Sequence, residues 1–341
     1  MITYFKDFTK IVHKYGMVVS GDCNSELFHR LGATETDLSV FKEIGVDILR
    51  MDFSFNDERD ATLINNKEGI KIEMSTSFIE IIEAAIKNGA KPENISTCHN
   101  FYPERYTAPS LEAINTINNY WKAKNIPVAI FISSLVKGSH GPWPVSDGLP
   151  TIEEHRDMPI EEQLKHCLAL DNVDEIIIGN AYASEDEFKA IDQVMKQVYV
   201  DVPKNEAFGF LADFIPHGMI KRVPFKIQLE EGTTELEKEI LFNYPTHSDL
   251  GDCMNYMLRS RWTRMIYKGK EIPCRPCAKT HYTRGDVVIV NDNLAHYRGE
   301  IQIVLKDMKV DGQRNLLGRI DESEIFILEH IKAKDVFTFV E

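Results

Sequence analysis

One stretch of the chain combines the side chains of a small-molecule site with the end of a predicted strand. The segment 97–107 follows an apolar run, and Pro103 stops the strand there. The segment supplies a general acid or base, two kinds of neutral hydrogen-bond partner and an anion-binding guanidinium, on His99, Asn100, Tyr102 and Arg105. A packed core does not need this mixture, so we expect a functional site at this strand end.

Short β-branched runs alternate with longer amphipathic segments over the first part of the chain. Seven runs predict strands, at residues 17–21, 47–51, 70–74, 95–98, 127–132, 175–179 and 197–201. The segments between them predict helices; residues 77–86, for example, have apolar positions at three- and four-residue spacing, with Gly89 near the end. Strand, helix, strand repetition favours right-handed crossovers and a parallel sheet.

Polar residues close nearly every one of these strands, at Asp22, Asp52, Ser75, Asn100, Ser133 and Asn180. In a (β/α)₈ TIM barrel this end of the strands carries the active site. No Gly-x-Gly-x-x-Gly turn follows an early strand, which weakens the alternative of an open dinucleotide-binding sheet. Residues 5–15 resemble a helix with no strand before it, as expected of an eight-stranded barrel that lacks its first strand.

Near residue 215 the pattern changes to period-two runs separated by turns. Strands are predicted at 225–229, 286–290, 300–305 and 336–340, with one short helix over 252–265. We therefore expect two domains, an α/β barrel over residues 1–215 and a small, mostly β domain over 220–341.

The formal charge of -14 argues against nucleic acid as a partner. No apolar run is long enough for a membrane span and no secretory leader is visible, so we expect a cytoplasmic protein without membrane contact. Cysteines inside apolar runs are typical of buried thiols in a reducing compartment, at Cys23, Cys98, Cys167 and Cys253.

Cys274 and Cys277, with His281 nearby, have the spacing of half a metal site or of a redox pair. A structural zinc normally needs four ligands, and His247 is the only obvious additional one. The sequence therefore predicts neither a metal nor a cofactor.

Four segments together, residues 99–107, 141–156, 178–183 and 285–303, resemble the 6-phospho-N-acetylmuramidase (MupG-type) family. The resemblance extends over essentially the whole chain. It implies a TIM barrel followed by a cyclophilin-like β domain. It also implies cytoplasmic hydrolysis of the disaccharide N-acetylmuramic acid 6-phosphate-N-acetylglucosamine during cell-wall recycling. The family normally begins with a strand and most of a helix before the position of Phe5, so one βα unit is expected to be missing here.

Glycoside hydrolysis needs a proton donor and a second carboxylate that acts as nucleophile or as base. Asp52 and Glu73 are the preferred candidates and Asp22 is the third, because each ends or follows a predicted strand. Arg50 shares strand parity with Asp52, and Lys71 shares it with Glu73. The alternative is a buried ion-pair belt that fills the barrel.

A 6-phosphosugar also needs cationic and neutral ligands. Arg105, beside Tyr102 and Tyr106, is the best-placed cation. Arg156 has the alternative of a salt bridge to Glu153 or Asp157, and His99 that of a satisfied core histidine. The complete set of predicted substrate ligands is Arg50, His99, Asn100, Tyr102, Arg105, Arg156, Asn180 and Arg298.

The long loop over residues 135–158 is predicted to be a lid or a binding loop, in which His140 and Trp143 would help to exclude water. Residues 291–293 of the β domain are candidates for substrate contact, although turn chemistry alone explains them.

Two other functions stay open at this point. One is a phosphosugar lyase or isomerase that uses Lys71 as a Schiff base, and the other is a sugar-binding protein without catalysis. The oligomeric state is also open.

Overall fold

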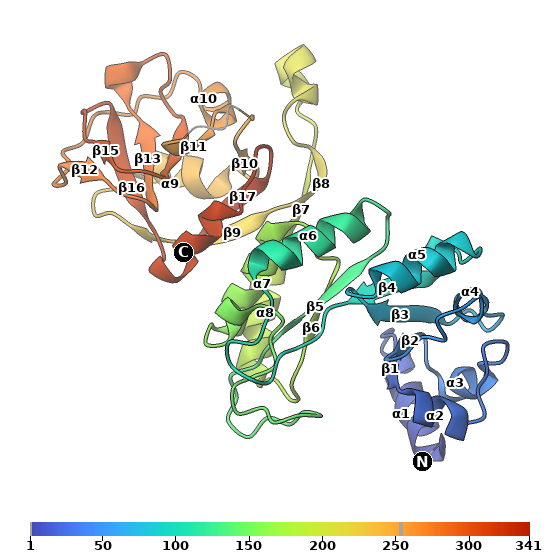
Figure 1. The fold of residues 1–341 in the computed structure, drawn as a ribbon. Helices are drawn as coiled ribbons and strands as arrows, with labels where there is room; N and C mark the ends of the chain where they lie inside the picture. The colour runs from blue at the N-terminus through green and yellow to red at the C-terminus, as the bar shows by residue number, and fades with distance from the viewer. Residues whose placement is uncertain (1, 252–254) are drawn as a thin grey trace. The chain divides into compact units, whose positions relative to one another are not determined.

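The computed structural model describes residues 2–251 and 255–341, and these residues form two compact units. The first unit contains the chain up to Pro159 together with Asp171–Ser184, and the second contains Ile160–Leu170 together with Glu185–Glu341. The predicted domain boundary between residues 215 and 220 stays a prediction. Figure 1 shows the elements of both units.

The first unit is built on a six-stranded sheet in which every neighbouring pair is parallel. The strands follow one another in chain order: β1 (Ser20–Cys23), β2 (Ile48–Met51), β3 (Lys71–Ser75), β4 (Ile95–Cys98), β5 (Val128–Ile132) and β6 (Glu175–Ile178). This order fits half of a TIM-like barrel. The first six predicted strands are thus confirmed to within a few residues.

The seventh predicted strand does not join this sheet, so that part of the prediction is wrong. It forms β7 (Tyr199–Val202), which pairs antiparallel with β8 (Gly218–Lys221) in a separate two-stranded sheet. Tyr199 and Asp201 are exposed, whereas Val200 and Val202 are half-buried. This alternation is typical of an antiparallel pair with one face exposed to solvent. A strand inside a parallel sheet would be buried on both faces.

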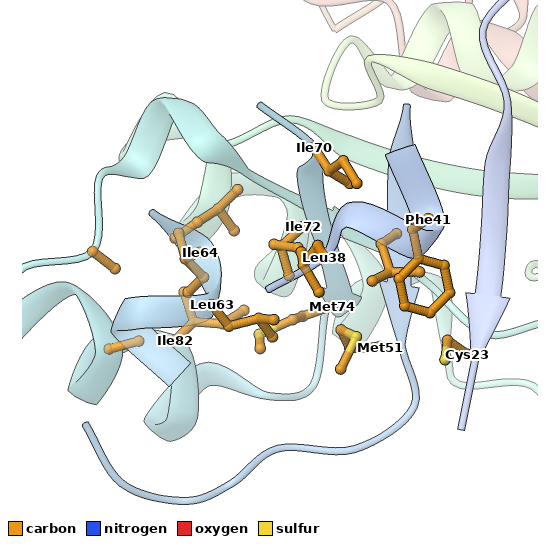
Figure 2. Close-up of a cluster of buried hydrophobic side chains, with 14 of the residues drawn as sticks. Cys23, Leu38, Phe41, Met51, Leu63, Ile64, Ile70, Ile72, Met74 and Ile82 are labelled. Carbon is orange, nitrogen blue, oxygen red and sulfur yellow. The ribbon is translucent and has the colours of Figure 1, made fainter. Parts of the chain in front are cut away.

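Five helices form the core of the parallel sheet together with alternate strand residues: α2 (Ser25–Arg30), α3 (Ser39–Ile44), α4 (Arg59–Ile64), α5 (Ile79–Lys87) and α6 (Leu111–Lys122). Helix α1 (Ile2–Lys14) packs against α3, and Thr9 is its buried residue. Figure 2 shows Ile72 and Met74 of β3 among side chains of this core, with Leu63 from α4 and Ile82 from α5. Since strand side chains alternate between faces, the residues between these apolar ones lie on the opposite face.

Local signals set the helix ends. The Ser110 hydroxyl accepts a hydrogen bond from the Ala113 amide at the start of α6. Gly45 ends α3 at a φ of 91°, and an added Cβ there would lie 2.6 Å from Thr9 Oγ1.

The second unit is a mostly β domain with a seven-stranded sheet ordered β10-β17-β9-β16-β13-β14-β11. Only the β9–β17 pair is parallel among the pairs described for this sheet. Its strands are β9 (Val223–Leu229), β10 (His247–Ser248), β11 (Met257–Ser260), β13 (Asp286–Val290), β14 (Ile301–Val304), β16 (Arg314–Ile320) and β17 (Val336–Val340). A small sheet pairs β12 (His281–Tyr282) with β15 (Met308–Lys309). The helices of this unit are α7 (Ile160–Leu170), α8 (Glu185–Val198), α9 (Glu235–Lys238) and α10 (Trp262–Ile266).

The helix predicted over residues 252–265 is largely wrong. The described part of this segment forms strand β11 and only then the short helix α10. Met257 to Ser260 pair with β14, so edge pairing with a neighbouring strand overrides the helical pattern. Asp252 and Cys253 lie outside the described residues.

Within residues 2–251 and 255–341, no helix combines the length and apolar content needed to cross a bilayer. Cys23, Cys98 and Cys167 are buried free thiols, as predicted, and Cys274 is exposed.

Candidate active site

Strand parity and register bring three predicted residues into one row on the open face of the parallel sheet. Asp22 of β1 pairs in register with Arg50 of β2, and Arg50 pairs with Glu73 of β3. The row continues to Ser96 of β4, whose buried hydroxyl has no hydrogen-bond partner in the described structure. Asp52 follows β2, and its amide extends the ladder by donating to the carbonyl of Cys23.

Arg50 is the centre of this row. Its Nη1 donates to Glu73 Oε1 at 3.3 Å, and its Nη2 donates to Asn100 Oδ1 at 2.9 Å. Its Nε lies 4.0 Å from both Asp22 Oδ1 and Asp52 Oδ1. The structure thus brings together five of the predicted site residues.

The three carboxylates around Arg50 differ in exposure. The side chains of Asp22 and Asp52 are 64% and 53% exposed, whereas that of Glu73 is only 4% exposed. Asp22 and Asp52 can therefore contact a ligand from solvent, whereas Glu73 is buried.

Burial and like charge shift two of these acids in the same direction. Burial raises the pKa of Glu73, although the Arg50 guanidinium opposes this shift. Partial burial also raises the pKa of Asp22, and the neighbouring Asp52 carboxylate adds to that rise. Burial thus favours the protonated form of Asp22 and Glu73, the form that acid catalysis by a carboxyl requires.

His99 and Asn100 follow β4 but lie in different environments. The exposed Asn100 side chain belongs to the Arg50 cluster. The buried His99 ring contacts Thr76 Oγ1 at 3.2 Å and Asn118 Oδ1 at 2.6 Å, and burial lowers the pKa of the ring. Both ring nitrogens are thus occupied, which corresponds to the core-histidine alternative.

Arg156 is buried and holds two loops together. It forms a bidentate pair with Glu153, at 2.6 and 2.8 Å, and donates to the carbonyls of Tyr102, Glu104 and Asp147. The guanidinium lowers the pKa of Glu153 to about 2. This is the salt bridge to Glu153 that the sequence left open, and it fixes the backbone of Tyr102, whose own side chain is half-buried.

Arg105 lies on the surface of the same loops. Its Nη1 contacts Asp157 Oδ2 at 2.7 Å, and its Nη2 lies 3.4 Å from Asp147 Oδ1. These two aspartates raise the pKa of Arg105 and compensate its charge. Tyr106 beside it is 82% exposed.

The side-chain amide of Asn180, which follows β6, makes all of its hydrogen bonds within the protein. Its Oδ1 accepts from the Ser133 hydroxyl and the Ser134 amide, and its Nδ2 donates to the Ser134 carbonyl and the Ser139 hydroxyl. All four hydrogen-bonding positions of the amide are occupied. Asn180 therefore fastens the loop that follows β5.

Two further predicted residues lie elsewhere. Lys71 is two residues before Glu73 on β3, nearer the amino-terminal end of the strand. Arg298 belongs to the second unit, where it donates to Asp292 Oδ1 at 2.9 Å. Neither adds to the row around Arg50 within the first unit.

The described residues contain no group of three or more metal-ligating side chains that could hold a metal ion. Cys274 Sγ lies 3.4 Å from the carbonyl of Gly312, and Cys277 packs against the buried cluster around Tyr282.

Sequence reasoning did not single out Lys137, an exposed lysine in the loop after β5. The sequence signal that could have found it is a lysine followed by Gly138 and Ser139 in the loop that begins at residue 133, after the strand predicted over 127–132.

Two family models match the chain. The description "6-phospho-N-acetylmuramidase, N-terminal" matches residues 1–193, and "6-phospho-N-acetylmuramidase, C-terminal" matches residues 223–340. No curated protein matches the chain.

Two solved structures are similar to the chain. The crystal structure of an uncharacterized B. cereus protein has 34% sequence identity and a TM-score of 0.83, and the match covers 99% of this chain and 88% of that one. A conserved Enterococcus faecalis protein with an unknown function has 25% identity and a TM-score of 0.65, with 99% and 84% covered. The two family matches cover both units, and the chain therefore belongs to the 6-phospho-N-acetylmuramidase family.

Proposed function

We propose that this chain hydrolyses the glycosidic bond of N-acetylmuramic acid 6-phosphate-N-acetylglucosamine in the cytoplasm, as a step of cell-wall recycling. The first unit would then be the TIM-barrel glycosidase part and the second a cyclophilin-like β domain. Family membership supports the muramidase activity. The observation that carries the proposal is the group of three carboxylates around Arg50 at the carboxyl ends of β1, β2 and β3.

The two exposed aspartates are the proposed reacting groups. Asp22 donates the proton to the leaving oxygen, because its pKa is raised and its side chain reaches solvent. Asp52, on the neighbouring strand, acts as the second carboxylate, either on the anomeric carbon or on water. A raised pKa keeps the donor protonated to higher pH than an ordinary aspartate allows.

Glu73 and Arg50 position this pair. The buried Glu73 carboxylate holds the Arg50 guanidinium, which in turn faces both aspartates and Asn100. The Oδ1 of Asn100 accepts a hydrogen bond from Arg50, which leaves its Nδ2 able to donate to a sugar hydroxyl. The exposed ring of Tyr106 offers a face for stacking on a sugar.

Amide substitutions test these roles because they keep the shape of each side chain. Asp22→Asn and Asp52→Asn should each lower turnover of the phosphorylated disaccharide about 100-fold, the usual effect of removing a general acid or base. Release of free N-acetylglucosamine measures turnover. Glu93→Gln is the matched control, since Glu93 is an exposed acid just before β4, at the amino-terminal end of the strands.

The pH profile separates the donor from the second carboxylate. With Asp22 as donor, the wild-type rate falls as the pH rises through the raised pKa of Asp22, and Asp22→Asn loses this dependence. Near-normal rates in both aspartate variants would refute the site. A full loss in Glu73→Gln, with Asp22→Asn active, would instead make Glu73 the donor.

A further inference from the structure

The loop after β5 is held in place by a dense set of hydrogen bonds within the first unit. The Asn180 side chain binds the loop at Ser134 and again at Ser139. The backbones of His140 and Ala181 pair with each other, and the Ser134 hydroxyl accepts from the Val136 amide. Residues 134–140 therefore have a fixed backbone at the carboxyl end of β5.

Lys137 lies in the middle of this loop and is exposed. No carboxylate of the described residues pairs with it. Two positions on, the Ser139 hydroxyl accepts from Asn180, so its proton remains available to donate. A cation and a hydroxyl donor are thus presented from one fixed loop.

The other cations of this edge are already compensated. The connections between β1–β6 and the helices that follow them contain three lysine or arginine residues, Arg105, Lys137 and Arg156. Arg105 pairs with Asp157 and Asp147, and Arg156 pairs with Glu153. Arg50, on β2 itself, faces three carboxylates. A dianionic ligand would meet repulsion at each of those sites, whereas Lys137 offers an uncompensated charge.

We propose that Lys137, with the Ser139 hydroxyl, binds the 6-phosphate of the muramic acid residue; this inference rests on the proposed function. β5 lies three strand positions from β2, the strand that carries Arg50, a separation of about 14 Å along a sheet. The phosphate and the bond to be cleaved belong to the same sugar, so a phosphate site near the Arg50 cluster is required. Asn180 acts as a positioning residue, because it fixes the loop and has no free hydrogen-bonding position of its own.

Binding of two sugars tests the inference directly. N-acetylmuramic acid 6-phosphate and unphosphorylated N-acetylmuramic acid are titrated calorimetrically into the wild-type chain and into Lys137→Met. The wild-type chain should prefer the phosphorylated sugar, and Lys137→Met should lose about 10- to 100-fold in affinity for that sugar alone, as for the loss of one charged hydrogen bond. Lys87→Met is the control, because Lys87 is an exposed lysine at the end of α5, on the side of the amino-terminal strand ends.

Two results would overturn the inference: an unchanged phosphate preference in Lys137→Met, or no such preference in the wild-type chain. A preference lost in Arg105→Met but kept in Lys137→Met would move the phosphate to Arg105. Cleavage of the disaccharide is a separate readout. A wild-type chain that binds the phosphorylated sugar through Lys137 but releases no N-acetylglucosamine would contradict the proposed hydrolysis and leave the phosphate site standing.

Discussion

Replacing Arg50 by methionine should destabilise the first unit in a way that depends on pH. In the described structure, Arg50 is the only cation paired with the Glu73 carboxylate, which is 4% exposed. Methionine keeps the aliphatic bulk but removes the charge. The buried carboxylate then takes up a proton instead of staying ionised without a partner.

The free energy needed to keep Glu73 protonated sets the size of the destabilisation. The ordinary pKa of a glutamate is 4.5, which is 2.5 units below pH 7. Keeping Glu73 protonated at pH 7 therefore costs up to about 3.4 kcal/mol. At pH 5 the same step costs only about 0.7 kcal/mol. A raised pKa in the folded state means that the native protein binds more protons than the unfolded chain above pH 4.5, so stability falls as pH rises.

Urea denaturation at pH 5 and pH 7 measures this effect. Arg50→Met should lose more free energy of unfolding at pH 7 than at pH 5. Adding Glu73→Gln to Arg50→Met should recover most of the loss at pH 7, because the amide carries no charge. An equal loss at both pH values, or no recovery in the double variant, would refute the reasoning.

Two further predictions concern the second unit. Lys165 and Glu324 form a salt bridge with side chains only 1% and 0% exposed, so Lys165→Met should lower the free energy of unfolding in urea by about 3–5 kcal/mol. Adding Glu324→Gln should recover part of this loss, and a loss below about 1 kcal/mol would contradict a stabilising buried salt bridge. His247 is buried between Ser260 Oγ and the Leu241 carbonyl, and burial lowers its pKa from 6.5 to about 4. The neutral ring is therefore favoured, and stability should fall as the pH drops from 6.5 towards 4, by about 3 kcal/mol in total. His247→Gln should show a flatter pH dependence of the urea midpoint, and identical profiles for the two proteins would exclude this assignment.

The parallel strands were predictable because each is a short apolar run between turn signals. The hairpin strand β7 was not, because its β-branched residues resemble those runs and only its partner, β8, distinguishes it. The same holds for residues 257–260, where pairing with β14 decides the structure. Local pattern thus predicts that a strand exists more readily than which sheet it joins.

The site was predictable in part for a related reason. Parity along a strand places Arg50 with Asp52, and the position of Asp22 and Glu73 on neighbouring strands follows from the chain order. The side chains of His99, Arg156 and Asn180 already have hydrogen-bond partners within the protein. These contacts join segments that are distant in the chain, and the pattern of a single sequence does not contain them. For the same reason the sequence could not distinguish a compensated Arg105 from an uncompensated Lys137.

The most direct test of the proposed hydrolysis is the fate of the water oxygen. The wild-type chain is incubated with the phosphorylated disaccharide in water enriched in the heavy oxygen isotope, and the masses of the products are measured by mass spectrometry. Hydrolysis predicts that N-acetylmuramic acid 6-phosphate carries the heavy oxygen at its anomeric carbon, while N-acetylglucosamine keeps the bridging oxygen, and that Asp52→Asn forms neither product at a comparable rate. Intact disaccharide after prolonged incubation, or products without the label, would contradict the account.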